Sequence, residues 1–340
     1  MQFLHKECFC AALIRSVLYA FIFVWFNSLF HLVRNMNLIQ LRYVREITRQ
    51  GLSVSNASEA LHTSQSGVSR QIQLLEEELK LQIFQRNGKR LIGITEPGEV
   101  IVKLAERVLR EMENIKRVGE EFTQKDKGTL TIATTHTQSR YFLPGAVKKF
   151  MESYPKVTLA IHQGNPTQVA EEVESGQADL GITTEVINTY EKLLCLPCYQ
   201  WNRFIITPKG HPLLTDLPLT LEKIAEYPLI TYNIAFSGSS MVKRVFNQAG
   251  LEPNIVLTAI DADVIKTYVD LGLGIGILAD MAYDPVRDAN LSTMDASHLF
   301  PDSTTYLGIR KDAFLRDYVY DFMQFLVPGL DRKAVFSAMN

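Results

Sequence analysis

The sequence predicts an α/β protein that joins an N-terminal winged helix-turn-helix, a long single helix and a two-lobed α/β domain. Three observations support this fold class. Short helical patterns meet at a tight polar turn near residue 63, and apolar residues recur at steps of three and four between residues 101 and 122. From residue 130 onward, strand-like and helix-like segments alternate. A chain of 340 residues is long enough for these separate parts.

The composition narrows the class of protein. With 46% hydrophobic and 21% charged residues, the chain is typical of a globular protein. The formal net charge of -2 excludes a global basic field, so any contact with nucleic acid has to use a local basic patch. Four cysteines, Cys8, Cys10, Cys195 and Cys198, are too few for a disulfide scaffold. We therefore expect a reducing, cytoplasmic location.

The first 35 residues differ from the rest of the chain. The apolar stretch "SVLYAFIFVWFNSLFHLV" is near the lower length limit for a membrane-spanning helix and is weakened by Asn27, Ser28 and His31. It lacks a clear signal-peptide cleavage site before Met36. We interpret Met36 as the functional start and residues 1–35 as an over-called extension, and we expect no membrane association. The alternative is a segment that anchors or exports the protein.

Residues 36–94 fit a winged helix-turn-helix. The first helix follows Asn37, stops at Gly51 and carries a buried stripe of Leu38, Leu41, Val44 and Ile47. A second helix covers Val54–Leu61, with inward-facing Ala57, Ala60 and Leu61. After a turn at residues 62–64, a third helix begins near Gln65 and buries Val68, Ile72 and Leu75. The alternative interpretation is a solvated three-helix bundle with an ordinary hairpin.

The third helix and the following hairpin carry the candidate DNA contacts. The polar face of the helix offers groups that pair with base edges or phosphates: Ser64, Gln65, Ser66, Ser69, Arg70 and Gln73. A hairpin turn at Asn87-Gly88 is surrounded by three cations and no acid, namely Arg86, Lys89 and Arg90. Such a basic wing supplies phosphate contacts that do not depend on sequence.

Residues 95–122 predict a helix that pairs with a second copy of the chain. Thr95 and Pro97 are typical of a helix start. A heptad-like apolar stripe follows: Ile101, Leu104, Val108, Met112, Ile115, Val118 and Phe122. We expect a homodimer or homotetramer, because helix-turn-helix proteins read two half-sites. The alternative is a helix that packs on its own domain. Residues 123–127 interrupt the pattern and are predicted to be a linker.

The remaining chain predicts two α/β lobes with parallel sheets. Lobe I is expected at residues 128–196 and lobe II at residues 197–300, with residues 301–340 returning to lobe I. Ligands of such folds bind in the cleft at the carboxyl ends of the strands.

Small hydroxyl side chains mark that cleft. In "TTHTQS", Thr135 and Gln138 fit a helix capping box, whereas Thr137 is not needed for capping. A helix start after a strand is also an anion site without any lysine. Thr184 follows another strand, Ser237 begins another helix and Trp201 lies at the crossover between lobes. Together they suit a small tetrahedral anion or a carboxylate.

The chain from Met36 to its end resembles LysR-type transcriptional regulators. The signature comprises Ala57, Leu61, Ser64-Gln65, Ser69, Ile72, Leu75-Glu76, Leu79, Ile83-Phe84 and Arg86, followed by Thr95, Pro97 and Gly98. Lys80 departs from it, because glycine is usual there; lysine can adopt the turn at some strain. Within this family, "TIATTHTQSRYFLPG", "QGNPTQVAEEV", "LPCYQWNR" and "AIDADVIKTYVDLGLGIG" resemble the CysB/Cbl subfamily.

This resemblance implies a regulator of sulfur assimilation and cysteine biosynthesis genes. It implies promoter DNA as a partner, sulfate in the cleft and acetylserine as inducer, with RNA polymerase as a further candidate partner. Thr135, Thr137 and Gln138 match the anion motif of the family, and Thr184 and Trp201 match further cleft positions. Ser237 stands where the family typically has threonine, which keeps the hydroxyl but loses a methyl group.

Other functions have less support in the sequence. Cys195 and Cys198 have redox-motif spacing, but we expect packed, unreactive thiols. The histidines lack metal-ligand spacing, and "GLGIG" does not follow a strand, so we expect no metal and no cofactor. No nucleophile elbow or paired-acid motif indicates an enzyme. The rival function is a two-lobed solute-binding receptor anchored or exported by residues 1–35, which would leave the helix-turn-helix unexplained.

Overall fold

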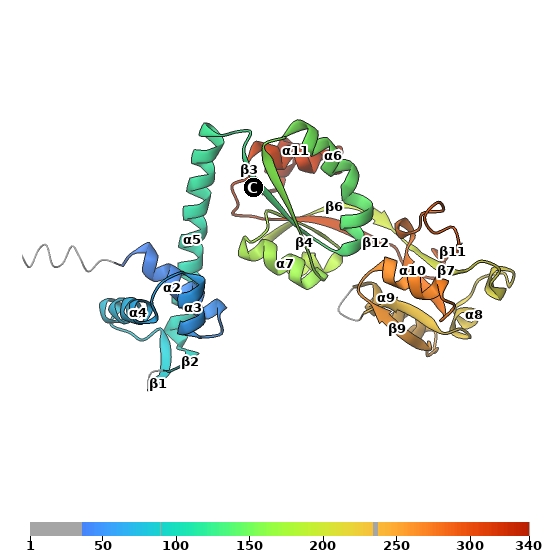
Figure 1. Cartoon of the computed structure of the whole chain (residues 1–340), viewed down its shortest axis with the longest axis horizontal. Coiled ribbons are helices and arrows are strands. Elements are labelled where there is room, and N and C mark those ends of the chain that lie inside the picture. The colour runs from blue at the N-terminus through green and yellow to red at the C-terminus, as the bar shows by residue number, and fades with distance from the viewer. Residues whose placement is uncertain (1–35, 89, 234–236, 340) are drawn as a thin grey trace, which may run out of the picture. The chain divides into compact units, whose positions relative to one another are not determined.

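Figure 1 shows the computed structural model, which describes residues 36–88, 90–233 and 237–339. The extension 1–35 and Lys89 lie outside this described part of the chain. The chain forms two compact units, one ending at Ile115 and the other beginning at Lys116. Within the described ranges, no helix is both long enough and apolar enough to span a bilayer.

The first unit has the predicted winged helix-turn-helix. It contains α2 (Leu38–Arg49), α3 (Val54–Ala60), α4 (Gln65–Leu79) and a hairpin of β1 (Phe84–Asn87) and β2 (Arg90–Ile94). Each helix starts with a side-chain cap, from Asn37, Ser53 and Ser64 respectively. The predicted apolar stripes of α2 and α4 meet in one core, which includes Val44, Ile47, Val68, Ile72 and Leu75.

Two details of the core prediction were wrong. Leu38, in the first turn of α2, is 41% exposed rather than buried. In α3, Ala60 is exposed while Ser58 is buried. Ser58 can lie inside because its hydroxyl donates to the carbonyl of Ser55 at 2.7 Å, which satisfies its polar group within the helix.

Glu76 fixes the wing against α4. Its buried carboxylate accepts hydrogen bonds from the backbone N–H groups of Ile83 (2.9 Å) and Phe84 (3.1 Å), and it pairs with Arg86 at 2.9 Å. Lys80 ends α4 in the left-handed conformation, with φ 55° and ψ 35°. This conformation explains why glycine is the usual residue in the family signature at that position.

The signature threonine and glycine at the start of the long helix also have a local reason. The Thr95 hydroxyl donates to the carbonyl of Gln82 at 2.6 Å and accepts from the N–H of Gly98 at 3.0 Å. A Cβ atom on Gly98 would lie 2.1 Å from the carbonyl oxygen of Ile83. Only glycine permits this close approach of the helix to the strand start.

Helix α5 (Glu96–Thr123) has two apolar faces. Val102, Ala105 and Leu109 are buried in the core of the first unit, and Ile101 and Met112 pack against it in part. The rest of the predicted stripe is exposed: Leu104, Val108, Ile115, Val118 and Phe122. Ile115 is 72% exposed and Phe122 is 80% exposed. One face of the helix thus packs on its own domain, as in the alternative interpretation, while pairing of the exposed face with a second copy stays a prediction.

The second unit contains two five-stranded sheets. Lobe I has the strand order β4-β3-β5-β12-β6. Its strands are β3 (Gly128–Thr134), β4 (Val157–Gln163), β5 (Leu180–Thr183), β6 (Leu193–Trp201) and β12 (Ser303–Arg310). Helices α6 (Leu143–Ser153) and α11 (Asp317–Leu326) cover one face and α7 (Pro166–Ser175) the other, and α12 (Arg332–Met339) follows α11 (Figure 1).

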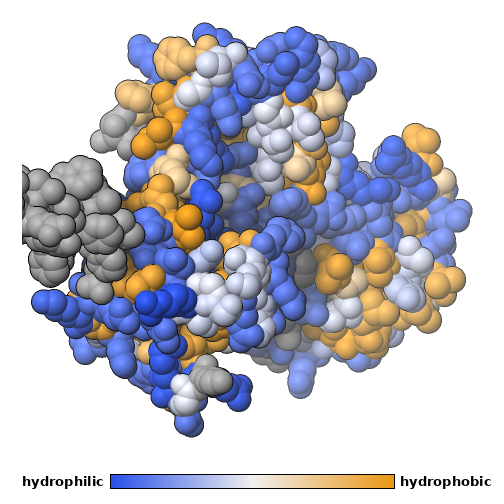
Figure 2. Space-filling view, turned by 60° about the vertical axis from the view of Figure 1, so that its left-hand side comes forward, coloured by the Kyte–Doolittle hydropathy of each residue, from blue (hydrophilic) through white to orange (hydrophobic). Residues whose placement is uncertain are grey.

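Lobe II has the strand order β11-β7-β10-β8-β9. Its strands are β7 (Arg203–Pro208), β8 (Leu229–Tyr232), β9 (Ile255–Ala259), β10 (Ile275–Ala279) and β11 (Leu291–Asp295). Helices α8 (Leu221–Ala225) and α9 (Ser237–Gln248) lie on one face, and α10 (Ala262–Asp270) lies on the other. On the face of the molecule shown in Figure 2, hydrophobic surface occurs as patches among hydrophilic side chains.

The sheets are mixed rather than parallel as predicted. In lobe I, β3 is parallel to β4 and β5, but β12 is antiparallel to β5 and β6. In lobe II, β7 is antiparallel to its neighbours β10 and β11. These antiparallel strands are the ones at the crossovers, where the chain leaves one sheet and enters the other. The return of β12 and α11 to lobe I is as predicted.

The first crossover lies at Asn202. Strand β6 continues in the lobe I sheet to Trp201, which pairs with Ser303, and β7 begins in lobe II at Arg203. The expected boundary after residue 196 falls inside β6. Asn202 is held in place because its side-chain amide donates to Asp302 at 2.7 Å, beside the returning strand.

Candidate functional site

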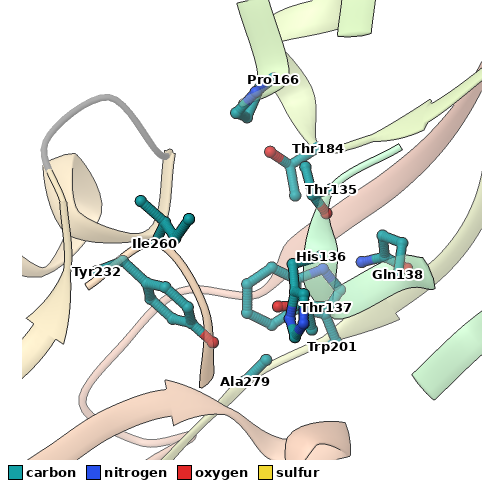
Figure 3. Close-up of a pocket in the computed structure, with 10 residues that line it drawn as sticks. All are labelled: Thr135, His136, Thr137, Gln138, Pro166, Thr184, Trp201, Tyr232, Ile260 and Ala279. Atoms are coloured by element: carbon teal, nitrogen blue, oxygen red, sulfur yellow. The ribbon is translucent and has the colours of Figure 1, made fainter. Parts of the chain in front are cut away.

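A small pocket lies between the two lobes at the carboxyl ends of their strands. Lobe I contributes Thr135, His136, Thr137, Gln138, Pro166, Thr184 and Trp201, and lobe II contributes Tyr232, Ile260 and Ala279 (Figure 3). Thr135 follows β3, Thr184 follows β5 and Trp201 ends β6, whereas Tyr232 and Ala279 end β8 and β10. The cavity volume is about 40 Å³.

Five sequence-predicted effector residues line this pocket together: Thr135, Thr137, Gln138, Thr184 and Trp201. The sixth, Ser237, begins α9, but its side chain lies outside the described residues. Sequence reasoning missed His136, Pro166, Tyr232, Ile260 and Ala279. The strand-end argument that identified Thr184 applies equally to Tyr232 and Ala279, so that signal was present for these two.

The predicted capping box of Thr135 and Gln138 was wrong. Gln138 does not reach back to Thr135; its amide nitrogen donates to the Thr305 hydroxyl at 3.2 Å, and its oxygen accepts from the Tyr199 hydroxyl at 2.5 Å. Its side chain is thus anchored to β12 and β6, and in Figure 3 it lies on the side of Thr137 away from Tyr232. The helix after Thr135 continues as a π-helical turn, η1 (Gln138–Phe142).

The pocket is rich in hydrogen-bond donors. The ten described lining residues include no lysine, arginine, aspartate or glutamate. Arg140, the nearest cation along the sequence, pairs with Asp263 at 2.7 Å. The first N–H groups of the helix after Thr135 have no partner within the helix, and its dipole favours negative charge there. Hydroxyls and backbone N–H groups are therefore the means by which this site can hold an anion.

Three buried atoms at this pocket have no hydrogen-bond partner among the described residues. They are Nδ1 of His136, Nε1 of Trp201 and the hydroxyl of Tyr232. Each such buried, unpaired group is unfavourable by about 1–3 kcal/mol. The indole N–H of Trp201 can only donate. The guanidinium of Arg203 lies over the Trp201 ring, 4.9 Å from its centroid, and supports its position.

Behind the pocket, charged side chains connect the two lobes. We call this group the interlobe clasp; it consists of Arg140 and Tyr141 from lobe I and Asp263, Lys266 and Asp288 from lobe II. Asp263 accepts from Arg140 Nε at 2.7 Å and from the Tyr141 hydroxyl at 2.8 Å. Lys266 donates to the Tyr141 hydroxyl at 3.0 Å and pairs with Asp288 at 2.9 Å. The clasp joins the turn that follows the pocket residues to α10.

The clasp explains two shifted pKa values. Burial by itself would raise the pKa of Asp263, but the Tyr141 hydrogen bond and the charges of Lys266 and Arg140 bring it below its ordinary value. Burial would lower the pKa of Lys266, yet its bonds to Tyr141 and Asp288 raise it. Both groups are therefore charged at neutral pH.

The fold also brings together His136, Asp261 and Asp263, whose nearest ligand-type atoms lie within 4.8 Å of one another. Sequence spacing did not predict this group, because its members come from different lobes. Asp261 already caps α10 by accepting from the N–H of Val264 at 2.8 Å, and Asp263 belongs to the clasp. Both carboxylates thus already accept hydrogen bonds from protein groups.

Most of the candidate DNA-contacting residues are exposed on α4 and the wing. Ser64, Gln65, Ser66, Arg70, Gln73 and Arg90 are exposed, and Ser69 is half-buried. The Ser64 hydroxyl caps α4 by accepting from the N–H of Gly67 at 3.1 Å. Arg86 is half-buried against Glu76, so its charge is already balanced. Lys89 lies outside the described residues.

Cys195 and Cys198 are both within β6, not at a helix start. Burial raises the pKa of both thiols, that of Cys198 to about 12. A thiol with a raised pKa is a poor nucleophile, which agrees with packed, unreactive cysteines.

A winged helix-turn-helix joined to a two-lobed domain with an interlobe pocket defines a ligand-responsive DNA-binding protein. Two family models match the chain: the bacterial regulatory helix-turn-helix protein, lysR family, over residues 38–99, and the LysR substrate binding domain over residues 123–331. The chain belongs to the LysR family of transcriptional regulators. This membership does not favour the solute-receptor alternative.

Among similar curated proteins, the regulators SsuR and CysB of Burkholderia cenocepacia are each 51% identical to this chain. The matches span 300 residues (88% of this chain, 97% of SsuR) and 305 residues (90% of this chain, 97% of CysB). The cbl regulator of Escherichia coli (strain K12) is 44% identical over 295 residues, covering 87% of this chain and 93% of the relative.

Among solved structures, the cofactor-binding domain of the Cbl transcriptional regulator is similar at a TM-score of 0.60. It has 41% sequence identity, and the match covers 63% of this chain and 93% of that one. A full-length OxyR variant from Pseudomonas aeruginosa matches with a TM-score of 0.62 at 20% identity, covering 86% of this chain and 98% of the other; this likeness concerns the fold alone.

Proposed function

We propose that this regulator binds promoter DNA of sulfur assimilation and cysteine biosynthesis genes and responds to a small anion in the interlobe pocket. The sulfur assignment is supported by the similarity to SsuR, CysB and Cbl regulators at 44–51% identity. The observation that carries the effector assignment is the pocket itself. Five residues predicted as anion contacts line one cavity without a charged side chain, at a helix start.

The size of the cavity favours a sulfate-sized effector. One water molecule needs roughly 10–15 Å³ of such volume, so the cavity of about 40 Å³ has room for only a few non-hydrogen atoms. A tetrahedral oxyanion suits this space. Acetylserine is larger and would extend into the neighbouring cavity of about 400 Å³, which shares His136 and Ile260 with this pocket.

The DNA-binding part of the proposal rests on α4, the wing and α5. Gln65 and Ser66 lie in the first turn of α4, the part of a recognition helix that meets base edges. Arg90 is an exposed cation at the start of β2, which supports a role in phosphate contact. The exposed apolar face of α5 fits pairing with a second copy of the chain. The dimer would then present two DNA-binding domains to two half-sites. We propose a homodimer or homotetramer, with RNA polymerase as a further partner.

The test compares sulfate affinity in wild type, Thr137→Val and Thr158→Val by calorimetry on the full chain. Thr158 is exposed on β4 and serves as the matched control. Loss of one hydrogen bond to a charged acceptor, about 1.5–3 kcal/mol, weakens binding roughly tenfold or more. We expect that loss for Thr137→Val alone, with unchanged melting temperature. Equal affinity of all three proteins would refute the effector site.

The DNA-binding proposal has its own test, a gel-shift titration with promoter DNA at several salt concentrations. We expect affinity to fall steeply as salt rises, because cationic side chains displace counterions from phosphates. Addition of sulfate or acetylserine should change that affinity or the length of DNA protected. Binding that does not depend on salt would argue against a basic wing on phosphate.

A further inference from the structure

We propose that Tyr232 is the lobe II hydrogen-bond donor to the effector, so that the effector must present acceptor oxygens to both lobes at once. This inference rests on the anion site proposed above and adds a residue from the opposite lobe. The contacts carried over from the family resemblance all come from lobe I, apart from Ser237.

The position of Tyr232 is the first support. It is the last residue of β8 and points its hydroxyl from lobe II toward the pocket residues of lobe I (Figure 3). Thr137 and the backbone of Ala279 lie beside this hydroxyl, but no hydrogen bond is completed with any described residue. The other lobe II lining residues, Ile260 and Ala279, have apolar side chains.

The state of the hydroxyl is the second support. Tyr232 is only 9% exposed, and its oxygen is buried. Burial raises the pKa of this phenol to about 12, so it keeps its hydrogen at neutral pH and can donate. A phenylalanine would fill the same space without leaving a polar group unpaired. A hydroxyl held unpaired beside a pocket is therefore matched to a ligand rather than to the fold.

The geometry also limits the class of effector. Hydroxyls and N–H groups approach from the lobe I side at Thr135, Thr137 and Trp201, and Tyr232 approaches from the lobe II side. A tetrahedral oxyanion carries oxygens in all these directions. A single planar carboxylate directs both oxygens to one side and leaves Tyr232 unpaired. The pocket should therefore prefer sulfate to acetate, and binding should favour the closed arrangement of the lobes.

The experiment measures sulfate affinity and melting temperature of the full chain for wild type, Tyr232→Phe and Thr231→Val. Thr231 is the matched control, because it is the neighbouring residue of β8 and also has a buried hydroxyl without a partner, but it does not line the pocket. Both substitutions remove an unpaired buried hydroxyl, so neither should lower the melting temperature without ligand. Only Tyr232→Phe should weaken sulfate binding, by about tenfold, which equals about 1.4 kcal/mol.

This pattern separates a ligand contact from a structural role. A residue that only supports the fold would lower the melting temperature without ligand, whereas Tyr232→Phe should reduce the stabilisation that sulfate adds. Equal sulfate affinity in wild type and Tyr232→Phe would overturn the inference, as would an equal loss in Thr231→Val. If the wild-type protein binds acetate as tightly as sulfate, the claim that the effector contacts both lobes at once is wrong. Absence of sulfate binding to wild type would instead contradict the proposed function itself.

Discussion

Replacing Arg140 with glutamine should loosen the interlobe clasp without unfolding either lobe. Arg140 donates to Asp263 at 2.7 Å, but its side chain is 43% exposed and that of Asp263 is 30% exposed. Exposed pairs contribute about 0.2–1 kcal/mol, and we take the upper end, about 1 kcal/mol, because Asp263 is partly shielded. The equilibrium between the closed and open arrangements of the lobes then shifts about fivefold toward the open one.

Effector release is the process that should report this change. On the proposed function, sulfate leaves when the lobes separate, so we expect its dissociation to be up to about fivefold faster in Arg140→Gln than in wild type. Trp201 lines the pocket and provides an intrinsic fluorescence signal for stopped-flow measurement. Salt should speed release in wild type more than in the variant, because the pair is open to screening.

The control for Arg140→Gln is Arg244→Gln. Arg244 is exposed on α9 in lobe II and contacts Met241 Sδ at 2.9 Å, so its replacement removes the same charge away from the clasp residues. If sulfate dissociates from Arg140→Gln at the same rate as from wild type and the control, the clasp does not hold the lobes closed on the effector. So would an equal response of wild type and variant to salt.

Further outcomes are expected from other described groups. Because the pKa of Asp263 is lowered in the fold, its contribution is complete above the ordinary value of about 4 and is lost as pH falls through the lowered pKa. The difference in sulfate affinity between wild type and Arg140→Gln should therefore stay level from neutral pH and decline only below about pH 4. Arg90→Ala should reduce the salt slope of DNA binding by about one unit at unchanged melting temperature. Arg86→Ala should lower the free energy of unfolding by roughly 1–3 kcal/mol, measured by thermal melting, because it leaves the buried carboxylate of Glu76 without its ion pair. Thiol-reactive probes should label Cys198 only after unfolding, since its pKa is raised to about 12; rapid labelling of native protein would contradict this.

The pairings behind the pocket could not be predicted from the sequence. Gln138 forms hydrogen bonds with Tyr199 and Thr305, which are 61 and 167 positions away, instead of the predicted capping box. No local pattern in the sequence indicates these partners. Arg140 pairs with Asp263 of the other lobe, a partner that no local pattern in the sequence indicates. Likewise, Arg86 appears in the sequence as one of a run of wing cations, and only the fold shows its charge balanced by Glu76.

The sequence by itself determined the parts of this protein whose causes are local. Helical periodicity and the polar turn at residues 62–64 predicted the winged helix-turn-helix, and hydroxyls that follow strands marked Thr135 and Thr184 as candidate cleft residues, both of which line the pocket. Tertiary structure alone decided which residues face one another across the lobes, including Tyr232 opposite Thr137. The physical reason is that caps and periodicity act over a few residues, whereas the cleft is closed by strands that enter it from distant parts of the chain.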